Sequence, residues 1–232
     1  MEYCELKIFI KMNTNINSDD MYSVISKFIN KSLLNDTKMK RVHKLNCFKF
    51  YTFGLPYPIE KDRVYKKDSI YAFNIRSISR EIIMRIGRCI VFNCDEFTVE
   101  GKDYKNFIYN KIEKIISLTP VVTIKKDGKY WTRECGIDEL SEQLNNNAKR
   151  KLQSYYGVCN IDESTNFIES IKQKNNRLIL VPYKGGYIAG NKFEIVVKGD
   201  KNSQQLAGIV AAMGLGEKCS AIGMGYCKIV WL

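Results

Sequence analysis

The chain has 232 residues, of which 45% are hydrophobic and 27% are charged, values typical of a folded soluble protein with a core of its own. Its 37 Lys and Arg residues exceed its 25 Asp and Glu residues, and the formal net charge of +12 favours a polyanionic partner such as a nucleic acid. No apolar run reaches the roughly 20 residues that a membrane span requires, and the N-terminal residues lack a signal-peptide pattern, so we expect a cytoplasmic protein without membrane contact.

The first part of the chain begins with a strand pattern followed by a helix pattern. Residues 3–12 place Leu6, Ile8 and Ile10 at every second position, which predicts a strand with one buried face. Capping side chains at 17–20 then precede an apolar stripe, which predicts a helix of about four turns.

The next patterns continue this alternation. Residues 48–53 and 69–75 are predicted strands, and isoleucines at helical spacing predict a helix over 78–90. Short strands at 89–100 and 108–118 complete the series. The predicted order of elements is therefore β-α-β-β-α-β, which is the ferredoxin-like unit.

The second part of the chain predicts a variant of the same unit. A hairpin is expected at 121–132, because Asp127-Gly128 is a strong turn signal. The remaining elements are predicted as a helix over 136–156, two strands within 178–197, a helix over 203–213 and a last strand over 226–232. We expect an α+β protein with an N-terminal domain at 1–118 and a C-terminal domain at 119–232.

The most informative stretch lies near the C-terminus. Two Gly-x-Gly pairs are separated by six residues and flank a lysine and a serine: Gly214, Gly216, Lys218, Ser220, Gly223 and Gly225. Glycine adopts positive φ and allows close backbone approach, so the N–H groups of such a loop can face a phosphate. Only seven residues follow Gly225, which excludes the βαβ unit of a dinucleotide-binding fold. The pattern therefore favours a loop that binds phosphate or RNA.

The eight cysteines contain no Cys-x-x-Cys pair, and the chain has a single histidine, His43. Structural zinc sites need closely spaced Cys and His ligands, so we expect no metal and no cofactor. In a reducing compartment the thiols act as small buried apolar groups. Any imidazole chemistry has to use His43, and imidazole exchanges protons readily near neutral pH.

The glycine-rich loop resembles that of the RAMP superfamily, in particular the CRISPR repeat-specific endoribonucleases that process precursor crRNA. The resemblance covers nearly the full chain and includes His43, the run 49–53, residues 119–122 and the Asn-rich basic helix at 145–152. It implies two tandem ferredoxin-like (RRM-like) domains, with the histidine in the first domain and the glycine-rich loop in the second. It also implies RNA as the partner.

The resemblance implies catalytic roles for His43 and Lys49, which are separated by the same six-residue interval found in family members with a His/Lys pair. Some members add a tyrosine on the first helix. That place holds Ser26 in this chain, with Tyr22 one turn earlier, so no third catalytic residue is assigned. The RNA-binding set that the resemblance implies combines the glycine-rich loop and the basic helix: Gly214, Gly216, Lys218, Ser220, Gly223, Gly225, Lys149, Arg150 and Lys151.

The implied reaction is metal-independent cleavage of CRISPR repeat RNA. The ribose 2′-hydroxyl attacks the adjacent phosphate and leaves a 2′,3′-cyclic phosphate and a 5′-hydroxyl. His43 would act as general base or general acid, and Lys49 would stabilise charge on the phosphorane. Two alternatives remain: a non-catalytic RAMP-type crRNA-binding subunit of a CRISPR ribonucleoprotein, and an unrelated basic ferredoxin-like RNA-binding module. Association with an effector complex and formation of a homodimer are also left open.

Overall fold

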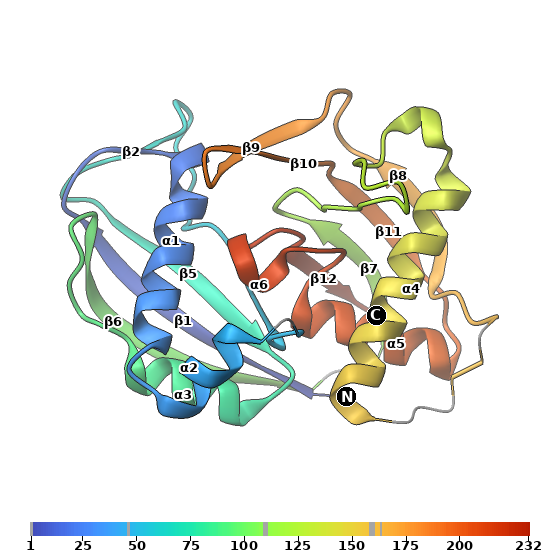
Figure 1. Cartoon of the computed structure of the whole chain (residues 1–232), viewed down its shortest axis with the longest axis horizontal. Helices are drawn as coiled ribbons and strands as arrows, with labels where there is room; N and C mark the ends of the chain where they lie inside the picture. The colour runs from blue at the N-terminus through green and yellow to red at the C-terminus, as the bar shows by residue number, and fades with distance from the viewer. Residues whose placement is uncertain (1, 46, 109–110, 158–160, 163) are drawn as a thin grey trace.

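The computed structural model describes residues 2–45, 47–108, 111–157, 161–162 and 164–232. Figure 1 shows two sheets, each covered by helices, that lie next to each other along the long axis of the molecule. The sheets have the strand orders β3-β5-β1-β6 and β12-β7-β11-β8, and each contains four strands. All the strand pairs within them are antiparallel.

The first sheet is formed by the N-terminal half of the chain. Its strands and the two helices that connect them are β1 (Glu2–Met12), α1 (Ser18–Leu33), β3 (Tyr51–Phe53), β5 (Ile70–Ser77), α3 (Arg80–Cys89) and β6 (Phe97–Ile108). Helix α1 begins after Asn17 and buries Met21, Ile25 and Phe28 on one face, as the apolar stripe predicts. A short helix and a two-stranded ribbon lie in the connections: α2 (Thr37–Lys44), β2 (Ile16–Asn17) and β4 (Val64–Tyr65).

The second sheet repeats this arrangement. Its elements are β7 (Ile112–Ser117), the 3₁₀ helix η1 (Arg133–Cys135), α4 (Ile137–Tyr156), β8 (Ile168–Gln173), β11 (Phe193–Val197), α5 (Lys201–Met213), α6 (Cys219–Ile222) and β12 (Cys227–Trp231). When the strands of each half are numbered along the chain, both sheets have the spatial order 2-3-1-4. The prediction of an α+β fold with two tandem ferredoxin-like units is therefore confirmed.

Several predicted elements differ from the observed ones. The strand expected at 108–118 to complete the first half is β7, which pairs with β11 and β12 in the second sheet. The chain thus enters the second sheet before the predicted division between 118 and 119. The segment 178–197 forms three strands rather than two, because β9 (Ile179–Tyr183) and β10 (Gly186–Gly190) make a separate hairpin before β11.

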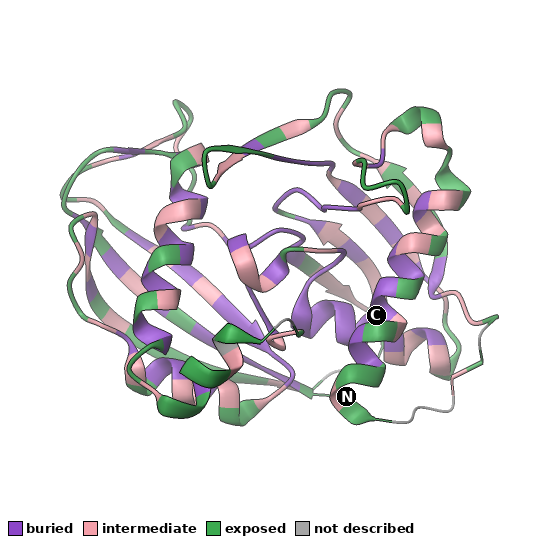
Figure 2. Ribbon diagram, viewed as in Figure 1, coloured by how far each residue is buried: buried purple, intermediate pink, exposed green. Residues whose placement is uncertain are grey.

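Three apolar clusters form the interior, which Figure 2 shows as buried segments along both sheets. The two large clusters lie between each sheet and its own helices. The third cluster is small and combines residues from four distant segments: Tyr22, Val122, Val181, Ile188, Ile222 and Met224. It joins α1 of the first half to the β9–β10 hairpin and the glycine-rich loop of the second half.

A buried ion pair also joins the halves. The Arg76 side chain on β5 pairs with Glu5 on β1 at 2.9 Å, and both side chains are about nine-tenths buried. The same guanidinium donates to the backbone carbonyls of Ala211 and Cys227, at 3.0 and 3.1 Å, and to the Tyr226 hydroxyl. Since these acceptors belong to the second half, the Arg76 side chain fixes the position of one half relative to the other. Within the described residues, no helix combines the length and apolarity that a membrane crossing would require.

Candidate functional site

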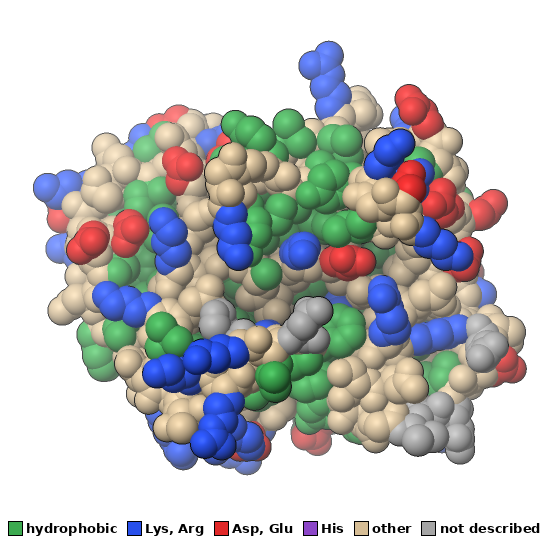
Figure 3. Space-filling view, in the orientation of Figure 1, with side chains coloured by type: hydrophobic (Ala, Val, Ile, Leu, Met, Phe, Trp, Pro, Cys, Tyr) green, Lys and Arg blue, Asp and Glu red, His purple; other side chains and the backbone are tan. Residues whose placement is uncertain are grey.

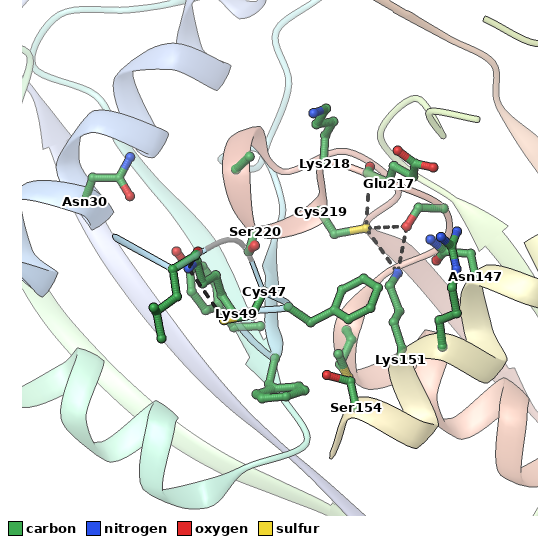
Figure 4. Close-up of a pocket in the computed structure, with 18 of the residues that line it drawn as sticks. Asn30, Cys47, Lys49, Asn147, Lys151, Ser154, Glu217, Lys218, Cys219 and Ser220 are labelled. Atoms are coloured by element: carbon green, nitrogen blue, oxygen red, sulfur yellow. Dashed lines mark hydrogen bonds between the residues drawn. The ribbon is translucent and has the colours of Figure 1, made fainter. Parts of the chain in front are cut away.

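A cleft of about 970 Å³ lies between the two halves. Figure 4 shows its residues as sticks, and Figure 3 shows Lys and Arg side chains around the hollowed centre of this face. The first half contributes α1 and the segment after α2, and the second half contributes α4, the β9–β10 turn and the glycine-rich loop. The polar and charged lining residues are Asn30, Lys49, Asn147, Arg150, Lys151, Ser154, Lys184, Glu217, Lys218 and Ser220.

The charge of the cleft is strongly positive. Five of its lining residues are Lys or Arg, and Glu217 is the one carboxylate among them. A concave surface with one sign of charge concentrates counter-ions of the opposite sign. The cleft therefore suits the phosphate backbone of a nucleic acid.

The structure places His43 in α2, close to the C-terminal end of that helix. The Asp36 side chain caps α2 by accepting from the Met39 N–H at 2.9 Å, and this hydrogen bond is the main cause that lowers the pKa of Asp36. A bond to Arg85 on α3 holds the same carboxylate. The side chain of His43 lies outside the described part of the structure. The residues directly after α2, including Leu45 and Cys47, line the cleft.

Lys49 lines the cleft next to this segment, but its ammonium group already has acceptors. It donates to the backbone carbonyls of Val42 and Leu45, and its distance to the Cys47 sulfur is 3.9 Å. These bonds tie Lys49 to the C-terminal end of α2, where carbonyl groups lack helical partners. In this arrangement Lys49 stabilises the turn that follows His43.

The glycine-rich loop has the backbone geometry that its sequence predicts. Its glycines have positive φ values of 85°, 73°, 71° and 65°, at Gly214, Gly216, Gly223 and Gly225 respectively. A Cβ atom at Gly225 would lie 1.8 Å from the Leu215 carbonyl oxygen, and all these glycines are buried. The loop is therefore packed tightly beneath the cleft.

Hydrogen bonds within the protein occupy several N–H groups of this loop. The N–H groups of Gly214, Leu215, Glu217 and Gly225 donate to the carbonyls of Val210, Gly225, Val122 and Pro120. The loop also contains α6, a helix of four residues that the sequence did not predict. Lys218 precedes α6 in the left-handed conformation, with a φ of 60°, and its side chain is exposed.

Lys151 has a different environment from the other predicted RNA-binding residues. It is 2% exposed, and its ammonium group donates to the carbonyls of Gly214 and Gly216, at 2.7 Å each. Its distance to the Cys219 sulfur is 3.5 Å, and burial raises the pKa of that thiol. Figure 4 shows these bonds beneath the loop. Lys151 thus holds the glycine-rich loop against α4.

The remaining predicted binding residues lie at or near the surface of the cleft. Arg150 is exposed and lines it from α4, and Ser220 lines it from α6. Lys149 is half-buried on the neighbouring face of α4. Hydrogen bonds from Ser164 are the main cause that lowers the pKa of Asp162, and the charge of Lys149 lowers it further. The structure therefore brings Arg150, Lys218 and Ser220 together with Lys49, and leaves Lys149 outside the lining.

The two residues considered for a third catalytic role both make contacts inside the protein. The Ser26 hydroxyl donates to the Ala221 carbonyl at 2.6 Å and so connects α1 to α6. Tyr22 is buried in the small third cluster, and burial raises the pKa of its hydroxyl. Asn30, one turn after Ser26, reaches the cleft instead.

Sequence reasoning missed several lining residues. Phe48 and Phe50 lie in the cleft, and the Phe50 ring contacts Tyr155 of α4 with ring centroids 5.3 Å apart. Phe50 has a φ of 59°, an uncommon conformation for a bulky residue. The sequence of 48–53 indicated a strand and gave no sign of this bend. Asn147 and Glu217 were also missed, although both are polar residues next to predicted binding positions.

A second cleft of about 600 Å³ adjoins the first. It lies between α4 and the turn at 121–131, and it shares four lining residues with the first cleft: Asn147, Arg150, Gly216 and Glu217. Among the described residues, no group of three or more His, Cys, Asp or Glu side chains could hold a metal ion.

Comparison with known proteins identifies the family to which the chain belongs. Residues 102–229 match the family model described as "CRISPR associated protein Cas6, C-terminal", which covers more than half of the chain. A solved structure named "CRISPR associated protein Cas6" superposes with a TM-score of 0.72 at 20% identity, over 98% of this chain and 99% of that one. A comparison with curated proteins gave no match.

Two further solved structures share the fold. "An RAMP protein binding different RNA substrates" has a TM-score of 0.68 at 18% identity and covers 98% of this chain and 99% of its own. A Cas6-related protein from Pyrococcus furiosus has a TM-score of 0.63 at 20% identity and covers 98% of both chains. The family match over the second half, together with full-length similarity of fold, shows that the chain belongs to the Cas6 family of CRISPR-associated RAMP proteins.

Proposed function

We propose that this protein is a metal-independent endoribonuclease that cleaves CRISPR repeat RNA within the precursor transcript. The observation that carries the proposal is the basic cleft between the halves of a Cas6-family fold. The segment after the His43 helix forms one wall of this cleft, and the glycine-rich loop forms another. RNA backbone bound there would lie between the two.

Binding would rest on side chains more than on loop N–H groups. Arg150, Lys184 and Lys218 line the cleft and can each neutralise a phosphate. The buried Lys151 side chain and the positive-φ glycines would act on binding through the shape of the loop. Half-buried Phe48 offers a ring for an unpaired base.

The chemistry follows from an intramolecular nucleophile. The ribose 2′-hydroxyl loses its proton and attacks the neighbouring phosphorus, and the bond from phosphorus to the 5′-oxygen breaks as that oxygen gains a proton. His43 supplies or accepts one of these protons. Lys49 stabilises the phosphorane oxygens once RNA draws its ammonium away from the carbonyls of Val42 and Leu45.

A second candidate is a non-catalytic crRNA-binding subunit of a CRISPR ribonucleoprotein. The observation that favours it is the Lys49 ammonium group, which backbone carbonyls occupy in this structure. In this alternative the cleft binds RNA and His43 has no chemical role. The two candidates differ in whether a bound repeat is cut.

The test uses the full-length protein and the repeat RNA of the CRISPR array encoded nearest to its gene. We expect cleavage at one position in excess EDTA, with a 2′,3′-cyclic phosphate on the upstream product. A single 2′-deoxy substitution at the cut site should abolish cleavage and preserve binding, because it removes the nucleophile alone. Cleavage of the deoxy RNA would contradict 2′-hydroxyl attack. Tight binding without any cleavage would favour the non-catalytic subunit.

A further inference from the structure

The junction of the two clefts contains polar side chains that have no partner among the described residues. Asn147 is 4% exposed and lines both clefts, yet no hydrogen bond joins its side chain to any described residue. The residue is buried as a whole, but its amide opens onto the clefts and is left for a bound group to satisfy. An amide held in this way by a packed helix face, without a partner among the described residues, therefore indicates a ligand.

Glu217 lies at the same junction and is the carboxylate that the first cleft contains. Its backbone is fixed between two left-handed residues, Gly216 and Lys218, and by a 2.9 Å hydrogen bond from its N–H to Val122. None of the ion pairs among the described residues includes Glu217. Figure 4 shows Glu217 and Asn147 on the same side of the cleft.

The wall of the second cleft also contains buried hydrogen-bond acceptors that have no partner among the described residues. Thr123 Oγ1 and Gln143 Oε1 are buried oxygens without a partner, and both residues line this cleft. Its charged lining includes Asp127, Glu139 and Glu142 as well as Glu217, against two lysines and Arg150. This balance makes the second cleft less favourable to phosphate than the first, and its acceptor oxygens suit a group that presents N–H donors.

In a bound RNA, the Glu217 carboxylate and the Asn147 amide suit the hydrogen-bonding edge of a base better than a backbone phosphate. A carboxylate accepts hydrogen bonds from adjacent N–H groups, and guanine presents two of them, N1–H and N2–H, on its Watson–Crick edge. The Asn147 amide can donate to guanine O6 at the end of the same edge. The volume of about 600 Å³ is within the range of pockets that hold small ligands.

We infer that Asn147 and Glu217 form a subsite that reads one unpaired guanine of the bound RNA. This inference rests on the proposed function, since it assigns base specificity to the same RNA-binding cleft. The phosphate of that nucleotide stays at the basic first cleft, near Arg150, and its base turns into the second cleft. Unpaired bases are the ones whose Watson–Crick edges a protein can reach.

The experiment combines protein variants with single-group changes in the RNA. Each guanosine of the repeat RNA is replaced singly by inosine, which lacks the N2 amino group, and Kd is measured for each RNA. We expect one position at which inosine weakens binding to the wild-type protein by about 5-fold to 150-fold. In Glu217→Gln the same substitution should change Kd less than twofold. Glu169→Gln, the same change on the remote strand β8, should behave as the wild type.

Asn147→Ala distinguishes a role toward RNA from a structural role. Because the amide has no partner among the residues that the structure describes, its removal should leave the Tm unchanged or raise it, while the preference for guanine over inosine falls. A wild-type protein that binds the repeat but shows no inosine position sensitive to Glu217→Gln would overturn the subsite and leave the proposed function standing. A wild-type protein that does not bind the repeat would overturn both.

Discussion

The two halves share one strand order but differ in the connection between their last helix and last strand. In the first half, residues 90–96 join α3 to β6 without a glycine. In the second half, residues 214–226 join α5 to β12 and include the positive-φ glycines and α6. The same strand order is thus combined with a short loop outside the cleft in the first half and with a loop that lines the cleft in the second half. The candidate cleft is lined mostly by helices and connections, and among the described residues Tyr51 of β3 is the one lining residue from the two four-stranded sheets.

The two halves also differ in the connection between their first helix and second strand, because only the connection of the first half lines the cleft in the described part of the chain. In the first half it contains α2 with His43, followed by Lys49 at the cleft. Each half therefore contributes a different connection to the lining of the cleft. The following predictions test this division of roles, in order of decreasing expected effect.

Removal of the imidazole tests the contribution of the first half. His43→Ala should lower the single-turnover cleavage rate by about 10²–10⁴-fold, because a proton-transfer group is lost. The Kd for repeat RNA should stay unchanged, since the binding residues come largely from the second half. Thr37→Ala, at the other end of α2, is the control and should cleave normally. Equal cleavage by both variants would move the chemistry away from α2.

Loss of the Arg76–Glu5 ion pair tests how strongly this buried pair stabilises the join between the halves. Arg76→Met leaves the Glu5 carboxylate buried and unpaired, so we expect a loss of about 3–5 kcal/mol in the free energy of unfolding. Adding Glu5→Leu removes the unpaired charge and should recover part of that loss. Chemical denaturation measures both. A loss below 1 kcal/mol for the single variant would show that the ion pair contributes little to the join.

A pair of glycine variants tests the contribution of the second half. Gly225 and Gly128 both have positive φ, and a Cβ meets the Leu215 carbonyl at Gly225 but nothing within 4 Å at Gly128. Alanine at either position costs about 1–2 kcal/mol for the left-handed conformation. Gly225→Ala should cost about 1–3 kcal/mol more through overpacking and should also weaken RNA binding. Equal stability of the two variants would contradict the close packing of the loop.

The smallest expected effects are those of single surface cations. Arg150→Ala and Lys218→Ala should each weaken RNA binding a few-fold and reduce the slope of log K against log salt by about one. Lys172→Ala, on the edge strand β8, is the matched control and should leave the slope unchanged. An unchanged slope in the cleft variants would place the phosphate path elsewhere.

Long periodic elements could be predicted from the sequence, because packing on one face imposes the period. Strand β1 and helices α1 and α5 lie close to their predicted positions. Helix α2 was missed because it is short and mostly polar, and the Asp36 cap and the buried Met39 side chain hold it in the absence of a long apolar stripe. The strand at 112–117 was assigned to the wrong half, since an apolar run carries no information about its pairing partner.

The site was predictable in part. The sequence indicated the glycine-rich loop, because the paired glycines have a direct conformational meaning. It did not reveal that Lys151 is buried, since a run of three basic residues suggests an exposed patch. A signal was present: Leu144, Ala148 and Lys151 recur at helical spacing and share the buried face of α4. Asn147 and Glu217 could not be found, because their lack of partners is visible in three dimensions alone.

The small third cluster has a consequence for the order in which the molecule assembles. It combines Tyr22 with Ile222 and Met224, residues separated by about two hundred positions along the chain, and it supports the glycine-rich loop. Contacts of such long sequence separation form late in folding, because chain closure is entropically costly. A nascent chain that ends before residue 214 therefore lacks one wall of the cleft, and the third cluster can form only after residues 222–224 have been added.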